Sequence, residues 1–571
     1  MNLNQPKEYP RRFVPEEADL GKWETIEPLF RNLQDRELKS KAALEQWLLD
    51  QSELFACLSE ERGRRYIRMT CHTDNAEYEK QFLDYLENIE PRCKPYEHAL
   101  NKKYAACPVR LEMDYERYKV LDRNIDAEIK LFREENIPLQ TESQKLSQSY
   151  QKLCGAMTVE FDGQEQTMPQ MAKYLEETDR PRRQEAWELI ARRRLQDREK
   201  MDEIFDQLIQ IRHRMALNAD YPAFIDYAFQ MYKRFDYTPL DCERFHQAVE
   251  ESVVPLARKI LERRRELMRL DRLRPWDTAV DPLGRPPLRP FQTGEELLAG
   301  VHKILTRVDP ELASIFQEMG RRGELDLESR KGKAPGGYQY TLDEIRRPFI
   351  FMNAAGLHRD VETLTHEAGH AFHAIATRNE PLLPYRDSPI EFAEVASMTM
   401  ELFCAEYYHE FYSEADAARA RRKHLEGIIE ILPWIARIDA FQHWLYSHPQ
   451  HTREERNRYW LELDQRFGMP LDWTGYEAAR ESLWQRQLHL FCHPFYYIEY
   501  GIAQLGALQV WKNFKRYGSS AVADYKKALA LGGSRPLPEL FKTAGAQFEF
   551  SAKIMAPLMS EVEKELASLA E

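Results

Sequence analysis

The chain has 571 residues, of which 43% are hydrophobic and 31% are charged, and its formal net charge is −13 at pH 7. Acidic and basic residues are interleaved along the whole chain, so no basic stripe suggests a nucleic-acid partner. No run of about 18 apolar residues occurs, which argues against a membrane-spanning helix. The composition therefore predicts a soluble, helix-rich protein without nucleic-acid or membrane partners, and it leaves the oligomeric state unknown.

The eight cysteines are scattered along the chain and show no CxxC spacing. The first residues, MNLNQPKEYPRRF, lack the apolar core of a signal peptide. Both features are typical of a protein with free thiols in a reducing compartment. We therefore expect a cytoplasmic protein.

Amphipathic helical segments dominate the chain. Residues 76–105 and 192–217 carry apolar residues at steps of three and four among charges, which is the pattern of helices in an all-α body. Residues 273–296 contain five prolines and are expected to be irregular. We expect a helical N-terminal region over residues 1–200 and a larger domain over residues 201–571.

One segment departs from this helical pattern. Residues 331–360 contain several glycines followed by the apolar run PFIFMN and then AAG. This order predicts a loop, a strand and a turn. We therefore expect a small β-sheet directly before the helical segment that follows.

The segment VETLTHEAGHAFH, residues 361–373, has the apolar pattern of a helix that Asp360 could cap. His366 and His370 are four residues apart, so both project from one helix face and can reach one ion at the Zn–N distance of about 2.1 Å. Glu367 is rotated by about 100° from His366 and lies beside such an ion. A general base at that position can take a proton from a metal-bound water. A pair of ordinary helix histidines is the alternative.

A catalytic zinc ion usually has a third protein ligand. His373 lies about 10.5 Å along the helix axis from His366, so we expect it to pack nearby and not to bind the ion. Glu394 is a better candidate, because a carboxylate among apolar neighbours is costly to bury unless it is paired or metal-bound. An ordinary salt-bridged helix is the alternative. The candidates to hydrogen-bond the ligating histidines are Glu391 and Glu401.

These motifs, with the upstream KAPGGY and RPFIFMNAAG and the downstream HPFYYIEYGIAQLGA, resemble the thimet oligopeptidase and oligoendopeptidase F family of zinc metallopeptidases. The resemblance covers about residues 200 to 560 and is closest to the oligoendopeptidase F branch. It implies a mainly helical, prolate body with a deep central substrate channel and a small sheet next to the HExxH helix. It also makes residues 201–571 the catalytic domain, with one zinc ion per chain held by His366, His370 and Glu394 and with Glu367 as general base.

The segment of residues 493–507 would bind the substrate and stabilise the oxyanion of the reaction, as the resemblance implies. His493 is one candidate. Tyr496 and Tyr500 are spaced i, i+4, and Tyr497 and Tyr500 are spaced i, i+3, so either pair can face one cleft. A phenol that donates to a developing oxyanion can contribute several kcal/mol. An aromatic helix face in the core is the alternative, and the choice between Tyr496 and Tyr497 stays open.

The predicted strand offers a way to bind peptides without a sequence requirement. An exposed strand edge beside the zinc could pair with an extended peptide through main-chain hydrogen bonds, and small residues after it would allow close approach. The PGGY loop, Pro335 to Tyr338, could close over the substrate. A buried ordinary strand and a plain turn are the alternatives. The candidate substrate-binding residues are Phe351, Asn353, Ala354, Ala355, Gly356, Gly336 and Gly337.

Together these features predict a zinc-dependent endopeptidase that hydrolyses internal bonds of short, unstructured peptides. Two other functions are compatible with the same helical scaffold. One is a zinc exopeptidase of the carboxypeptidase type. The other is a catalytically silent peptide-binding protein, although the presence of Glu367 and of all three predicted ligands counts against it.

Overall fold

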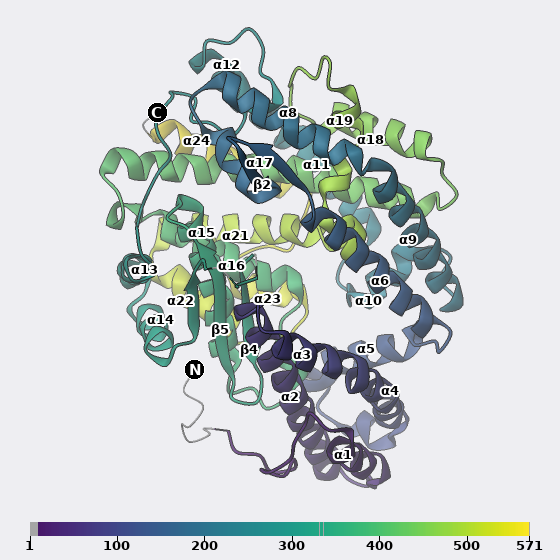
Figure 1. Ribbon diagram of the computed structural model, residues 1–571. Helices are drawn as coiled ribbons and strands as arrows, with labels where there is room; N and C mark the ends of the chain where they lie inside the picture. Colours follow the sequence, from purple (N-terminus) through teal and green to yellow (C-terminus); the bar gives the residue numbers. More distant parts are fainter. Residues whose placement is uncertain (1–8, 331, 335, 570–571) are drawn as a thin grey trace. The chain divides into compact units, whose positions relative to one another are not determined.

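The computed structural model describes residues 9–330, 332–334 and 336–569, and helices dominate it as predicted (Figure 1). The chain forms two compact units, and each is assembled from three separate segments. The first unit contains residues 1–130, 289–421 and 506–548, and the second contains residues 131–288, 422–505 and 549–571. Residue 200 lies inside a helix of the second unit, so the units do not follow the predicted division into sequence regions, which stays a prediction.

The first unit surrounds a small sheet with helices. Strands β3 (Leu325–Glu328), β5 (Arg347–Ala354) and β4 (Tyr338–Leu342) lie in that order, with β3 parallel and β4 antiparallel to β5. Helix α15 (His358–Thr377) contacts both β4 and β5, and helix α16 (Ile390–Ala405) packs along α15. The remaining helices of this unit are α1 (Trp23–Asp35), α2 (Lys41–Cys71), α3 (Ala76–Asn88), α4 (Glu90–Ala106), α5 (Tyr115–Leu131), α13 (Gly294–Val308), α14 (Pro310–Arg322), α22 (Ser519–Leu529) and α23 (Leu537–Thr543).

The second unit is almost entirely helical. The two short strands β1 (Thr158–Phe161) and β2 (Gln164–Thr167) form a hairpin. The proline-rich segment of residues 273–296 holds one 3₁₀ turn, Pro275–Asp277, before α13 begins, which confirms the irregular connection. Two helices, α17 (Glu414–Ser447) and α21 (Ile498–Tyr517), have residues in both units. The helices that lie within the second unit are α6 (Asn136–Gly155), α7 (Met168–Met171), α8 (Arg180–Gln196), α9 (Arg198–Asn218), α10 (Phe224–Met231), α11 (Pro239–Ser252), α12 (Val254–Leu267), α18 (Arg453–Phe467), α19 (Glu477–Glu481), α20 (Leu488–Cys492) and α24 (Ala552–Ser568).

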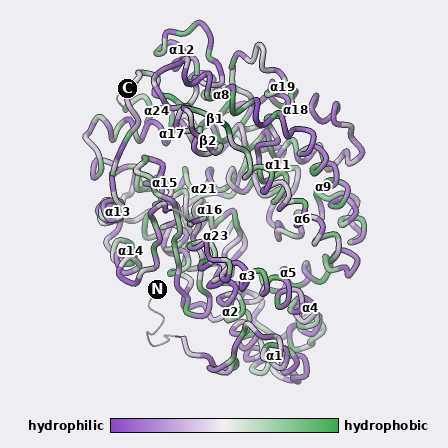
Figure 2. The backbone as a smooth tube through the Cα atoms, viewed as in Figure 1, coloured by the Kyte–Doolittle hydropathy of each residue, from purple (hydrophilic) through white to green (hydrophobic). Residues whose placement is uncertain are grey.

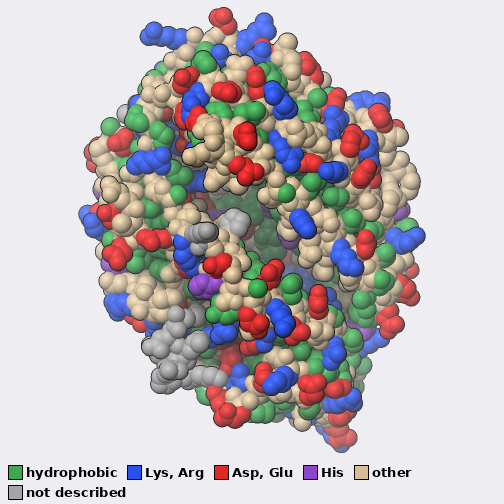
Figure 3. All heavy atoms as spheres, in the orientation of Figure 1, with side chains coloured by type: hydrophobic (Ala, Val, Ile, Leu, Met, Phe, Trp, Pro, Cys, Tyr) green, Lys and Arg blue, Asp and Glu red, His purple; other side chains and the backbone are tan. Residues whose placement is uncertain are grey.

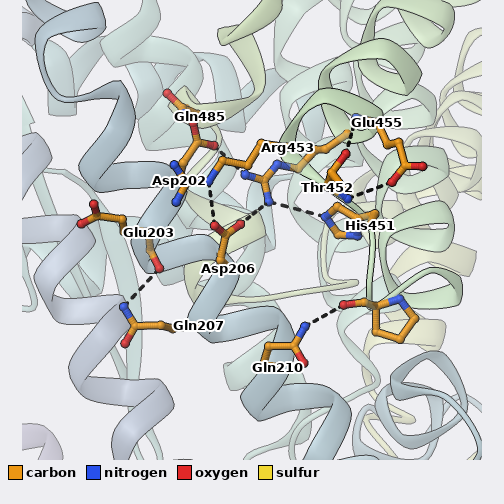
Figure 4. Close-up of polar contacts among 12 residues, drawn as sticks. Asp202, Glu203, Asp206, Gln207, Gln210, His451, Thr452, Arg453, Glu455 and Gln485 are labelled. Atoms are coloured by element: carbon orange, nitrogen blue, oxygen red, sulfur yellow. Dashed lines mark hydrogen bonds and ion pairs between the residues drawn. The ribbon is translucent and has the colours of Figure 1, made fainter.

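Buried and partly buried ion pairs join α18 to α9 in the second unit. Arg456 of α18 is 1% exposed and donates to Asp202 and Asp206 of α9, both at 2.7 Å. Arg453 donates to the same Asp206 at 2.8 Å (Figure 4). Because a buried guanidinium is costly unless it is paired, these carboxylates hold α18 against α9 in one register.

The surface shows the charge pattern expected from the sequence. Hydrophilic and hydrophobic residues alternate along the helices (Figure 2), and acidic and basic side chains are interspersed over the face shown in Figure 3. Within the described residues, no helix is long and apolar enough to cross a membrane. All eight cysteines are free, as predicted.

Candidate active site

Helix α15 carries the HExxH motif and begins two residues before the predicted cap. Asp360 lies in the first turn of the helix, and its Oδ2 accepts hydrogen bonds from the backbone N–H groups of Ala355 (2.8 Å) and Leu357 (2.9 Å). Asp360 was expected to cap the helix, and it does so from the first turn, where its carboxylate accepts the N–H of Leu357, the residue before the helix. The same carboxylate closes the turn between β5 and α15, where Gly356 has a φ of 83°.

The three predicted metal ligands converge in the first unit. His366 and His370 lie on one face of α15, with ring centroids 4.9 Å apart. Glu394 approaches from α16, and its Oε2 lies 3.4 Å from His366 Nε2 and 3.7 Å from His370 Nε2. One donor atom from each of the three residues lies within 4.8 Å of the other two. Donors bound to one tetrahedral zinc ion lie roughly 3.4 Å apart, so these three side chains could hold a single ion, and their role as ligands stays a prediction.

Two further residues of α16 orient the ligands. Glu401 Oε1 lies 2.6 Å from His366 Nδ1, and this contact leaves His366 Nε2 to face Glu394. Ser397 Oγ donates to Glu394 Oε2 at 2.9 Å. Partners of this kind fix the tautomer of a ligating histidine and the orientation of a ligating carboxylate. Of the two predicted supporting glutamates, Glu401 contacts a histidine ring, whereas Glu391 is buried in the first turn of α16.

The charges in this cluster suit a cation. Burial opposes protonation of His366, but the hydrogen bond and negative charge of Glu401 outweigh it and raise the pKa of His366 to about 9. Burial lowers the pKa of His370 to about 3, with a further contribution from the charge of His366, so its ring is neutral and free to coordinate. Burial also raises the pKa of Glu394. Glu401 therefore attracts positive charge into a buried site in which His370 offers a neutral nitrogen donor.

Glu367 is poised for proton transfer beside this cluster. Its side chain is buried, and burial raises the pKa of its carboxyl to about 7, while the charge of His366 and the backbone N–H of Gln339 on β4 lower it. A general base is most effective when its pKa lies near the working pH. His373, which was not expected to bind the ion, is buried against Phe392 with ring centroids 6.3 Å apart.

The predicted strand is present, but the expected open edge is wrong. β5 is the central strand of the sheet, so both of its edges are paired. Phe351 is buried with its ring stacked on Tyr338 at 4.8 Å, and the carbonyl of Ala354 accepts from Ser329 N. Among the described strands, β3 and β4 each pair with β5 alone, so both are edge strands, and Gln339 of β4 faces Glu367. An apolar run indicates that a strand exists, but the partners of that strand depend on the tertiary structure.

The glycine loop before β4 is tied down at its base. Asn353 Nδ2 donates to the carbonyls of Ala334 (2.7 Å) and Gly336 (2.9 Å), so this predicted substrate-binding side chain holds the loop. Gly336 has a φ of 97°, which favours glycine, and both Gly336 and Gly337 are exposed. Pro335 lies outside the described residues. The exposed Ala355 and the buried Gly356 follow β5, and their role in binding stays a prediction.

The tyrosine segment lies in the second unit. The rings of Tyr496 and Tyr497 each lie 5.5 Å from the ring of Tyr500. Burial raises the pKa of Tyr497 to about 12, and its hydroxyl shares hydrogen bonds with Trp434 and Gln487. The Tyr497 phenol therefore carries its proton at neutral pH, and a tyrosine hydroxyl can donate a hydrogen bond.

The sequence analysis did not identify His489 as a candidate site residue. Its ring lies 4.8 to 5.9 Å from all three tyrosine rings and 6.2 Å from the exposed ring of His493. Burial lowers the pKa of His489 to about 4, so the ring is neutral. The i, i+4 spacing of His489 and His493 was a signal that could have identified it.

A strained residue fixes the start of this segment. Phe495 has a φ of 66°, which is uncommon for a residue with a side chain, and it is fully buried. Its N–H donates to Gln442 Oε1 at 2.6 Å, and its carbonyl accepts from Arg234, which also pairs with the buried Glu499 at 2.7 Å. Strain of this kind persists when the surroundings determine the conformation, and it often marks functional segments.

Comparison with known families identifies the chain. A family model described as peptidase family M3 matches residues 173–559, and a model of the peptidase M3 N-terminal domain matches residues 15–132. The chain belongs to peptidase family M3. This membership confirms the predicted resemblance and agrees with a metal centre built on α15 and α16.

Curated relatives of this M3 peptidase are bacterial oligopeptidases. The oligopeptidase PepF of Bacillus subtilis is 26% identical over 325 residues, which cover 54% of this chain and 47% of PepF. An oligoendopeptidase F homolog of Borreliella burgdorferi is 31% identical over 205 residues, which cover 34% of each chain. Each matched region therefore spans about half of the length of the relative or less.

Solved structures match nearly the whole chain. Pz peptidase A, determined with an inhibitor, is 28% identical, and the match covers 98% of this chain and 99% of that one with a TM-score of 0.90. A structure assigned as an oligoendopeptidase F is 29% identical with the same coverage and TM-score. These likenesses confirm the mainly helical fold class and agree with membership of a peptidase family.

Proposed function

We propose that this M3 peptidase is a zinc-dependent oligoendopeptidase that hydrolyses internal bonds of short, unstructured peptides. The observation that carries the proposal is the convergence of His366, His370 and Glu394 within 4.8 Å, beside the buried Glu367. Two imidazoles and one carboxylate are the donor set of hydrolytic zinc sites that keep one position open.

The residues present fit a zinc ion. His370 is neutral, Glu401 holds His366 Nδ1 so that Nε2 faces Glu394, and Ser397 fixes Glu394. A zinc ion bound by this set would acidify a water molecule and polarise the scissile carbonyl.

Glu367 supplies the proton transfers. Its carboxylate accepts the proton of the attacking water and then delivers that proton to the leaving amine, because it is the buried carboxyl beside the metal ligands whose pKa lies near neutrality. Tyr500, acting with Tyr496 or Tyr497 and with His493, stabilises the oxyanion, as the family resemblance implies.

The open edge of β4 is the proposed peptide-binding surface. A peptide that pairs with β4 by main-chain hydrogen bonds runs past Gln339, whose N–H faces Glu367. This mode of binding uses backbone groups and therefore tolerates many sequences. The neighbouring Gly336 and Gly337 carry no side chain that could obstruct the approach.

Hydrolysis of an internally quenched peptide blocked at both termini tests the proposal. We expect turnover that a chelator abolishes and that added zinc restores. Glu367→Gln should keep the zinc but lower kcat by about 10²- to 10⁴-fold, because it removes the general base. Glu362→Gln, on the same helix one turn earlier, is the matched control and should retain activity. Zinc-free protein with full turnover would contradict the proposal.

The same substrate separates the two rival functions. An obligate exopeptidase would cleave the unblocked peptide and leave the doubly blocked one intact. A silent peptide-binding protein would bind both and cleave neither, with Glu367→Gln indistinguishable from the wild type. We propose the cytoplasm as the compartment, because all eight cysteines are free.

A further inference from the structure

A second cluster of metal-type donors lies in the second unit, on α11 and α17. Cys242 and His246 are four residues apart on α11, and Asp439 and His443 are four residues apart on α17. Each pair therefore projects from one helix face. Donor atoms of Cys242, Asp439 and His443 all lie within 4.8 Å of one another. Small side-chain rotations would bring them to the separation of roughly 3.4 to 3.8 Å that one tetrahedral ion requires.

The carboxylate in this cluster is incompletely bonded. Asp439 is 0% exposed, and its Oδ2 lies 2.8 Å from His246 Nε2. Its Oδ1 is buried without a hydrogen-bond partner in the described part of the chain. His443 Nε2 lies 3.3 Å from Asp439 Oδ2 but likewise forms no hydrogen bond there. Buried polar atoms are nearly always bonded, so two unbonded atoms in one cluster indicate a ligand between them.

The charges support a divalent cation. The side chains that contact the Asp439 carboxylate are those of the two histidines, and a metal-bound Cys242 thiolate together with that carboxylate would have a net charge equal and opposite to that of a divalent ion. An isolated buried carboxylate would be costly. Thiolate and imidazole donors favour zinc and disfavour magnesium or calcium.

We propose that Cys242, Asp439 and His443 bind a second zinc ion, with His246 holding Asp439 in place by a hydrogen bond. The ion would join α11 to α17 behind the strained start of the tyrosine segment, since the ring of His443 lies 5.4 Å from the ring of Phe495. This site is separate from the HExxH cluster and does not depend on the proposed peptidase function.

Cobalt substitution distinguishes the two sites. The HExxH ligand set contains no sulfur, so a thiolate-to-cobalt charge-transfer band reports on Cys242 alone. Apo-protein of the full chain should bind two equivalents of Co²⁺ and show this band. The double variant His366→Ala/His370→Ala should bind one equivalent and keep the band. Cys242→Ser should bind one equivalent and lose it, while Cys93→Ser, another buried cysteine, should behave as the wild type.

Two outcomes would overturn the proposal. One is a wild-type protein that binds one equivalent without the band, which would make the cluster a plain histidine–aspartate hydrogen-bond network. The other is a band that persists in Cys242→Ser. If Cys242→Ser does not fold, X-ray absorption at zinc in His366→Ala/His370→Ala, whose α11 and α17 are intact, decides the matter. One sulfur at about 2.3 Å supports the site, and a shell of nitrogen and oxygen alone, or no bound zinc, contradicts it.

Discussion

Gly369 of α15 packs directly against the backbone of Ser397 on α16. A Cβ atom on Gly369 would lie 2.6 Å from Ser397 Cα and 2.8 Å from the carbonyl oxygen of Ala396. The glycine lies between Glu367 and His370, so it allows the helix with two metal ligands to approach the helix with the third. Gly369 therefore has a packing role in addition to spacing His370 from Glu367.

Gly369→Ala should destabilise the protein and weaken the metal site. The added methyl group cannot be accommodated without separating α15 from α16, and overpacking of this kind costs about 1–3 kcal/mol. We expect a lower urea midpoint and a lower zinc affinity. Gly427→Ala on α17 is the matched control, because a Cβ there meets nothing within 4 Å, and it should be neutral or slightly stabilising. Equal effects of the two substitutions would refute this packing role.

Glu401→Gln should lower zinc affinity about 10- to 100-fold, because it weakens the hydrogen bond that orients His366. The measurement is competition with a chromogenic chelator. Glu406→Gln provides the control, since Glu406 terminates the same helix and pairs with Arg421 at 2.9 Å, away from the histidines. An unchanged affinity in Glu401→Gln would show that His366 is oriented by packing alone.

Tyr500→Phe should lower kcat by about 10²-fold with a smaller change in KM, as expected for loss of one donor to an oxyanion. Tyr497→Phe should lower kcat less, because its hydroxyl already shares hydrogen bonds with Trp434 and Gln487. Steady-state kinetics on the quenched peptide measure both variants, and Tyr496→Phe completes the set. A larger loss of kcat in Tyr497→Phe than in Tyr496→Phe would instead assign the partner of Tyr500 to Tyr497.

Glu324 should make stability depend on pH. It is 3% exposed beside β3, 3.8 Å from Arg347, and burial raises the pKa of its carboxyl to about 7. Since this folded-state pKa exceeds the unfolded value of about 4.3, the folded protein binds more protons between these values, and stability falls as pH rises from about 4.5 to 7. We expect a loss of about 2 to 3 kcal/mol across this window, and none above it.

Glu324→Gln should remove this slope and raise the thermal midpoint at pH 8 more than at pH 5. Glu311→Gln is the control, because the Glu311 side chain is 70% exposed and pairs with Lys526 at the surface. Its slope should match that of the wild type. A Glu324→Gln protein with the wild-type slope would show that Arg347 keeps Glu324 ionised throughout.

The sequence by itself determined the features that depend on local spacing. The i, i+4 pair His366 and His370 shares a helix face whatever surrounds it, and Glu367 must then lie beside that face. The apolar neighbours of Glu394 predicted burial, and the run PFIFMN predicted a strand. These inferences hold because helical and strand periodicities are properties of the chain itself.

Only the tertiary structure decided which elements lie side by side. It made β5 the central strand and β4 an edge strand, placed Glu401 on a histidine ring, and gathered His489 with the tyrosines. It also brought Cys242 of α11 against His443 of α17, some 200 residues later in the chain. Contacts of such sequence separation are set by packing of helix faces and by closure of long loops, and neither leaves a local pattern in the sequence.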